Sequence, residues 1–276
     1  MDTRFWGPSG WKLFHLITFE AEHRSVAKRV ENAVEFANFF ETIPYILPCK
    51  FCRASLTDYY RQHPYQINGK LDLTLDLKKW MYTIHNCVNG KLRKQGLHPA
   101  ADPTYTQVKK TYTEFQKQSW DQQLLHLWDF LFSVAYHHPK ESSFDSAPMP
   151  DCPEEAKKCN DPCERNKWNV LHWRKRMYWF RRFWIYLPDV LPHDIAKQWK
   201  AVQSRNPPAW GCRRSMLAWL WRMRCGLDSE FHDPYTSVCH RMKSYSSDCG
   251  KSRGAITCRR SRPSHSRRRK TLRKTK

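Results

Sequence analysis

Two cysteines separated by two residues are the side chains of this sequence best suited to chemistry. They lie in Pro48-Cys49-Lys50-Phe51-Cys52, at the predicted start of a helix. Two cysteines in a first helical turn can form a strained, reactive disulfide, and the positive end of the helix dipole stabilises a thiolate there. The pattern is also half of a zinc site, but residues 53–84 contain no second cysteine pair, and zinc needs four ligands. The motif therefore favours redox chemistry over a metal site or inert cysteines.

A second motif places hydrogen-bonding side chains on one side of a predicted helix. His85 and Asn89 are four residues apart, so they project from one helical face, and Asn86 lies beside them. A basic turn with Lys91 and Lys94 follows directly. This arrangement suits a flat heteroaromatic ligand that ends in phosphates. The alternative is an ordinary amphipathic helix whose polar side carries histidine and asparagine.

A third motif lies near the N-terminus. Trp11 and His15 follow Gly7-Pro8-Ser9-Gly10 and also share one helical face, where they could clamp a planar ring. Taken singly, a tryptophan and a histidine on an apolar stripe are more often core residues.

The residues that must position these motifs are predicted to be helical. Apolar side chains recur at helical spacing, and the alternation that is typical of strands is scarce. We therefore predict an all-α fold, with a turn at Asn68-Gly69. We expect five helices. The first opens at Pro8 and Ser9, the second runs from Ser25 to Pro44, and the third begins just after Pro48. The fourth runs from Thr74 to Gly96, and the fifth spans Thr104 to Gln116.

Taken together, the three motifs resemble those of one known family. Gly-x-Ser-x-Trp-x-x-x-His, Pro-Cys-x-x-Cys and Trp-x-x-x-x-His-Asn-x-Val-Asn occur here in that order, over about residues 5–116. This pattern resembles the Erv/ALR family of FAD-dependent sulfhydryl oxidases. The resemblance implies an N-terminal four-helix bundle that holds the flavin at its mouth, a short fifth helix packed across it, and a homodimer.

The resemblance also implies roles for individual residues. Cys52 matches the flavin-proximal cysteine, and Cys49 matches the interchange cysteine that accepts electrons from a protein dithiol through a mixed disulfide. Electrons would pass from protein thiols to this pair, then to FAD, then to O2, giving H2O2. The implied FAD-site residues are Ser9, Trp11, His15, Trp80, His85, Asn86, Val88, Asn89, Lys91 and Lys94.

Some positions depart from the family pattern. Thr83 stands where many relatives have a second histidine, and Pro8, Gly10 and Ala37 replace residues that are common in relatives. No cysteine occurs between residues 88 and 151, so the disulfide that ties down the fifth helix in cellular members is absent. Cys87 has no evident partner and is predicted to be a passive thiol. None of these departures removes a sulfur that the reaction needs.

The chain beyond residue 118 divides by composition. We predict an oxidase domain over 1–118, a connecting helix over 119–138, and a proline-rich, acidic linker or loop over 139–163. Cys159 and Cys163, with Cys152 nearby, are candidates for the shuttle pair that family members commonly use. An ordinary loop disulfide, or a zinc site completed by a distant histidine, is the alternative.

Residues 164–250 form a predicted, mostly helical C-terminal domain rich in tryptophan and arginine. Its Trp and Arg side chains could grip a nucleic acid or dock a protein, but their irregular spacing favours a packed domain. Residues 251–276 contain twelve Lys and Arg and no acid. We predict that they form a disordered tail that binds nucleic acid or another polyanion, or that acts as a localisation signal.

Overall composition restricts the class of protein. The 276 residues carry a net charge of +22 and 11 cysteines, and no stretch approaches the roughly 20 apolar residues of a membrane span. No signal peptide is evident either. In carrying an added basic domain, the chain resembles the family members of large double-stranded DNA viruses. This resemblance implies a location in the host cytoplasm or the virion. The two rival hypotheses are a zinc-stabilised or disulfide-stabilised virion protein that binds nucleic acid, and a scaffold that has lost its flavin.

Overall fold

The computed structural model describes residues 3–97, 101–141 and 147–246, and its fold is all-α, as predicted. In these residues the only sheet is a hairpin of β1 (Gln66–Ile67) and β2 (Lys70–Leu71). Asn68 and Gly69 form its turn with φ values of 50° and 75°, which an Asn-Gly pair adopts more readily than other residues. The predicted basic tail lies outside the described residues.

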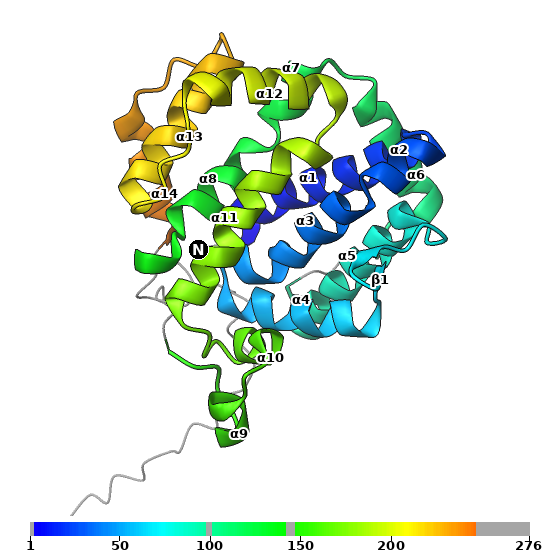
Figure 1. Ribbon diagram of the computed structural model, residues 1–276, viewed down its shortest axis with the longest axis vertical. Helices are drawn as coiled ribbons and strands as arrows, with labels where there is room; N and C mark the ends of the chain where they lie inside the picture. The colour runs from blue at the N-terminus through cyan, green and yellow to red at the C-terminus, as the bar shows by residue number, and fades with distance from the viewer. Residues whose placement is uncertain (1–2, 98–100, 142–146, 247–276) are drawn as a thin grey trace, which may run out of the picture.

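The helix that carries the motif cysteines, α4, belongs to a group of four that pack in the spatial order α3, α4, α5, α1 (Figure 1). A short α2 joins α1 to α3, and α6 packs across α1 and α5, as the resemblance implies for a fifth helix. The bounds are α1 (Thr3–His23), α2 (Val26–Glu31), α3 (Ala33–Ile46), α4 (Lys50–Gln62), α5 (Leu77–Lys94) and α6 (Tyr105–Gln116).

Local capping decides where these helices begin. Ser25 caps α2 by accepting a hydrogen bond from the Lys28 amide, but the helix predicted to continue to Pro44 is interrupted at Asn32. The cap of α5 is Asp76, not Thr74, because the Asp76 carboxylate accepts from the Lys79 amide. Thr104 caps α6 in a full capping box, which confirms the predicted fifth helix.

Two prolines that were expected to start or stop helices, Pro8 and Pro44, lie inside helices, and so does Pro188. Pro8 lies within α1, Pro44 within α3, and Pro188 within α11 (Trp173–Val190). Each proline removes one backbone donor from its helix. Apolar neighbours such as Leu187 and Val190 are fully buried, so tertiary packing outweighs this local cost.

The second half of the chain adds further helices. The connecting helix predicted over 119–138 is two helices, because the amides of His126 and Leu127 bond to carbonyls only three residues back and interrupt it. The elements are α7 (Trp120–Leu125), α8 (Trp128–Tyr136), the 3₁₀ turn η1 (Pro139–Glu141), α9 (Glu154–Lys158), α10 (Pro162–Lys167), α11, α12 (His193–Arg205), α13 (Arg213–Leu227) and α14 (Tyr235–Ser246).

One hydrophobic core joins the two halves. α11 packs along α3, and α8 packs on both α1 and α13. Phe183 of α11 contacts Phe39 of α3, and Trp184 contacts Trp219 of α13, in a cluster of buried residues that runs from Trp6 to Met242. The domain boundaries predicted at residues 118, 138 and 163 follow changes in composition, and this division of the chain stays a prediction.

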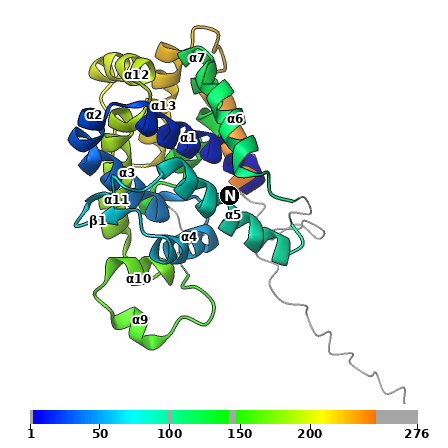
Figure 2. The same cartoon turned by 90° about the vertical axis from the view of Figure 1, so that its right-hand side faces the viewer.

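The two views place α9 and α10 together at one end of the molecule, next to α4, and α12 at the other end (Figures 1 and 2). None of the described helices has the length and apolar character that a membrane crossing requires.

Candidate functional site

The structure places both motif cysteines at the start of α4. Cys49 is the N-cap residue, and its carbonyl accepts hydrogen bonds from the amides of Cys52 (3.1 Å) and Arg53 (3.0 Å). Both sulfurs therefore lie in the region where the helix dipole favours negative charge. Cys49 is only 3% exposed, whereas Cys52 is half-buried.

Four planar side chains meet where α1, α5 and α6 pack together, and they form what we call the ring cluster: Trp11 and His15 of α1, His85 of α5, and Tyr112 of α6. The Trp11 and His85 rings stack with centroids 3.8 Å apart, and His15 stacks on Tyr112 at 4.3 Å. His15 Nε2 lies 3.1 Å from His85 Nδ1, within hydrogen-bond distance. The structure thus brings together three predicted residues and adds Tyr112, which the sequence did not indicate.

His15 is fully buried and holds a neutral imidazole. Burial lowers its pKa well below the usual range, and the nearby His85 lowers it further. The buried Nδ1 of His15 has no hydrogen-bond partner among the described residues. A buried polar atom without a partner costs free energy, so this nitrogen is suited to bond a ligand.

Lys91 connects the ring cluster's helix to the cysteine helix. Its ammonium donates hydrogen bonds from α5 to Ser55 Oγ (2.5 Å) and to the Phe51 carbonyl (3.4 Å) on α4. Asn89, two residues earlier, donates to Asp102, which also pairs with Arg93. Ser55 and Asp102 are site residues that the sequence analysis missed, because nothing in their local sequence marks them.

The other predicted cofactor residues lie in different surroundings. Ser9 Oγ accepts a hydrogen bond from the Phe130 amide, so it faces α8. Trp80 is buried among Phe40, Tyr60 and Tyr65 and donates to the His63 carbonyl. Three predicted residues remain on α5: Asn86 and Val88 are half-buried, and Lys94 is exposed.

Cys87 lies closer to the motif cysteines than its sequence context suggested. Its sulfur is 3.7 Å from His63 Nε2, and burial raises the pKa of the thiol. Burial also raises the pKa of Tyr59, with smaller effects from Cys87, Asp58 and Cys52. Tyr59 is therefore near both Cys87 and Cys52.

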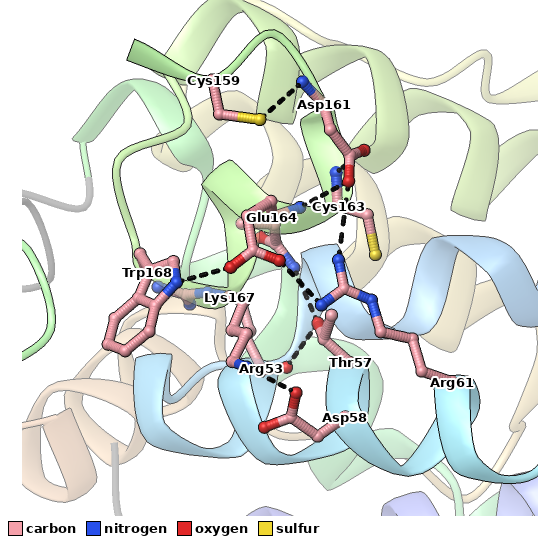
Figure 3. Close-up of polar contacts among 11 residues, drawn as sticks. Arg53, Thr57, Asp58, Arg61, Cys159, Asp161, Cys163, Glu164, Lys167 and Trp168 are labelled. Carbon is pink, nitrogen blue, oxygen red and sulfur yellow. Dashed lines mark hydrogen bonds and ion pairs between the residues drawn. The ribbon is translucent and has the colours of Figure 1, made fainter. Parts of the chain in front are cut away.

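The candidate shuttle cysteines lie on the segment that packs against α4 (Figure 3). Arg61 of α4 pairs with Glu164 (2.8 Å) and Asp161 (3.5 Å). The two sulfurs point in different directions: Cys159 accepts from the Asp161 amide, whereas Cys163 lies beside Arg61. Burial raises the pKa of Cys163, and the Arg61 charge opposes that effect.

Residues 147–169, which we call the cover segment, are bonded to the chain on both sides of Cys49. Asn166 donates to the Pro44 carbonyl (2.9 Å), and the Lys50 ammonium donates to the Ala147 carbonyl (3.0 Å). Arg53, fully buried, donates to Asn169 Oδ1 (2.8 Å). Residues 151–163 are mostly exposed, and the part that follows them is docked. The cover segment therefore lies between Cys49's flanking residues and solvent.

The side chains that meet here fit a cofactor of defined chemistry. Stacked planar rings and a buried imidazole nitrogen suit a heteroaromatic ring system, and three cations in the last turn of α5 suit phosphates. Within the described residues, no group of three or more His, Cys, Asp and Glu side chains is arranged to hold a metal ion.

Comparison with known proteins gives matches to the first half of the chain. The model of the Erv1 / Alr family matches residues 8–121. A protein of Acanthamoeba polyphaga mimivirus named a probable FAD-linked sulfhydryl oxidase is 30% identical over 122 residues, which is 44% of this chain and 80% of that protein.

Two further relatives carry similar names. An FAD-linked sulfhydryl oxidase of African swine fever virus is 30% identical over 91 residues, covering 33% of this chain and 70% of the viral protein. The mitochondrial FAD-linked sulfhydryl oxidase of Saccharomyces cerevisiae is 29% identical over 93 residues, 34% and 46% of the two chains. No solved structure matches this chain.

Proposed function

The chain belongs to the Erv1 / Alr family, and we propose that it is an FAD-linked thiol oxidase whose redox-active pair is Cys49 and Cys52. The observation that carries this proposal is the bridge made by Lys91, which bonds α5 to Phe51 and Ser55, on either side of Cys52 in α4. The bridge holds the helix of His85 against the helix of the cysteines.

The ring cluster and the end of α5 would hold the cofactor. Trp11, His15 and His85 would contact its rings, and Asn89, Lys91 and Lys94 would lie toward its phosphates. FAD, when bound, supplies the capacity to accept two electrons and to pass them to oxygen, with hydrogen peroxide as the product. Ser9, Trp80, Asn86 and Val88 stay in the proposed set on the family resemblance alone.

The protein's own chemistry is thiol–disulfide exchange. A substrate thiolate attacks Cys49 Sγ of the Cys49–Cys52 disulfide, forming a mixed disulfide and releasing the Cys52 thiolate. The second substrate thiol then attacks the substrate sulfur of that bond, which frees Cys49 and leaves an oxidised substrate. The dipole of α4 stabilises the Cys52 thiolate that this exchange produces.

A substrate thiol can reach Cys49 only if the residues around it move, because Cys49 is almost fully buried. We propose that the cover segment moves when a substrate is oxidised. Cys159 and Cys163 lie on this segment, so they remain our candidates for a shuttle pair. A homodimer, and a location in host cytoplasm or virion, are likewise proposed from the family resemblance.

The proposal is tested by purifying the full chain and measuring its cofactor and its oxygen consumption. We expect a yellow protein that releases FAD on denaturation and consumes oxygen with dithiothreitol, forming peroxide. A folded, colourless protein that takes up no FAD and consumes no oxygen would contradict the proposal. It would support the rival hypothesis of a scaffold that has lost its flavin.

A further inference from the structure

A hollow on the second half of the molecule has no role in the proposed oxidase chemistry. It has a volume of about 630 Å³ and lies between η1, the outer face of α11 and the turn before α13. All the residues that line it fall between 138 and 211, outside the part of the chain that the family model matches.

The hollow presents large aromatic and apolar side chains to solvent. Trp173 is 39% exposed, Tyr178 50% and Ile185 54%, although each would gain free energy by burial. Tyr178 and Ile185, seven residues apart, lie on one face of α11, and Trp173 in its first turn lines the same hollow. Such an exposed group on one face is typical of a binding surface.

The same face carries cations without acidic partners. Lys140, Arg174 and Arg181 line the hollow, and none of them forms an ion pair within the described part of the chain. No lining residue is acidic, and the one acid of α11, Asp189, is paired with Lys200 at the far end. The hollow therefore has a positive potential that would attract a polyanion.

The Tyr178 ring and the floor of the hollow are held in place. Arg182 donates to the Tyr178 hydroxyl (2.5 Å) and to Asn38 (2.8 Å), and its guanidinium lies over the Tyr178 ring. At the floor, buried His138 donates from Nε2 to the Trp210 carbonyl (3.0 Å). A site whose side chains are already fixed loses less entropy when a ligand binds.

We propose that this hollow binds single-stranded nucleic acid. The cations without acidic partners would contact the phosphates, and the exposed rings of Trp173 and Tyr178 would stack on bases, which is the combination that such sites use. An acidic peptide would satisfy the cations but would leave the two exposed rings without planar partners. The nucleic acid is therefore the ligand that accounts for both sets of side chains.

The test is fluorescence anisotropy of a labelled oligothymidylate of about 12 nucleotides with the full-length protein, over a series of salt concentrations. The double variant Trp173→Ala/Tyr178→Ala keeps the charge, and we expect it to weaken binding by about tenfold for each base that loses its ring. The double variant Arg174→Gln/Arg181→Gln should reduce the slope of log K against log salt by about 1.4.

A charge-matched control separates the hollow from the general basic character of the chain. Arg205→Gln/Arg222→Gln removes the same charge from exposed positions of α12 and α13 outside the hollow, and should change binding much less. If both hollow variants bind like the wild type, the proposal is overturned. It is also overturned if an oligoglutamate peptide competes more strongly than the nucleotide and loses affinity in the same variants, since the ligand is then an acidic peptide.

Discussion

The guanidinium of Arg53 donates a 2.8 Å hydrogen bond to the side chain of Asn169, 116 residues further along the chain, and both residues are buried. Arg53 directly follows Cys52 in α4, and Asn169 ends the cover segment. This bond therefore ties the proposed redox helix to a part of the chain that lies outside residues 8–121, the range that the family model matches.

Removing Asn169 should destabilise the fold because it takes one acceptor from a buried charge. We expect Asn169→Ala to lower the free energy of unfolding by about 1.5–3 kcal/mol, the range for a hydrogen bond to a charged group. Urea unfolding measures this. Asn38→Ala is a matched control, because Asn38 accepts from Arg182 in a half-buried setting, and its cost should be smaller. An equal loss of unfolding free energy in the two variants would mean that the Arg53–Asn169 bond stabilises the fold no more than the half-buried bond of Asn38.

Loosening the cover segment should expose Cys49. In the double variant Asn166→Ala/Asn169→Ala, the segment loses its bonds to Pro44 and Arg53, so we expect faster alkylation of Cys49 in the reduced protein. Peptide mapping after iodoacetamide treatment measures the rate. Lys157→Ala, on the exposed part of the same segment, should leave the rate unchanged. An unchanged rate in the double variant would show that other residues bury Cys49.

Buried His15 should make stability depend on pH. Its pKa is lowered in the folded state, so below pH about 6.5 the unfolded chain binds a proton that the folded chain does not. Stability should then fall with falling pH by about 1.4 kcal/mol per pH unit from this residue. Denaturant unfolding between pH 7 and about 5 should show a shallower dependence in His15→Gln than in the wild type. The exposed-site control His193→Gln should keep the wild-type slope, and a wild-type slope in His15→Gln would refute the role of His15.

Loss of the Lys91 ammonium should reduce both cofactor retention and turnover. Lys91→Met keeps most of the aliphatic stem but removes the bonds to Ser55 and Phe51. We expect a lower ratio of FAD to protein after gel filtration, while Lys109→Met, exposed on α6, should keep the wild-type ratio. Full retention in Lys91→Met would place Lys91 outside the cofactor site.

The local parts of this structure could be predicted from the sequence. Pro48 predicts the helix start at which Cys49 and Cys52 lie. The capping box of Thr104 and Gln107 predicts the start of α6. The order of the three motifs also identified the family. For the helix start and the capping box, the signal lies within a few residues of the feature it predicts.

Contacts between distant residues could not be predicted in this way. Tyr112 stacks on His15 across 97 positions, and Asn166 reaches Pro44 across 122. The sequence around a helical tyrosine or asparagine does not indicate which distant residue that side chain will contact. The helix boundaries predicted at Pro8 and Pro44 were wrong for a related reason, because packing against other helices, which a local pattern does not contain, keeps those helices intact.

The most direct test of the central claim is oxygen consumption with dithiothreitol by three cysteine variants of equal flavin content. We predict that Cys49→Ser and Cys52→Ser each abolish turnover, and that Cys225→Ser, on the exposed side of α13, keeps the wild-type rate. Wild-type oxygen consumption in either Cys49→Ser or Cys52→Ser would contradict the assignment of this pair as the redox centre.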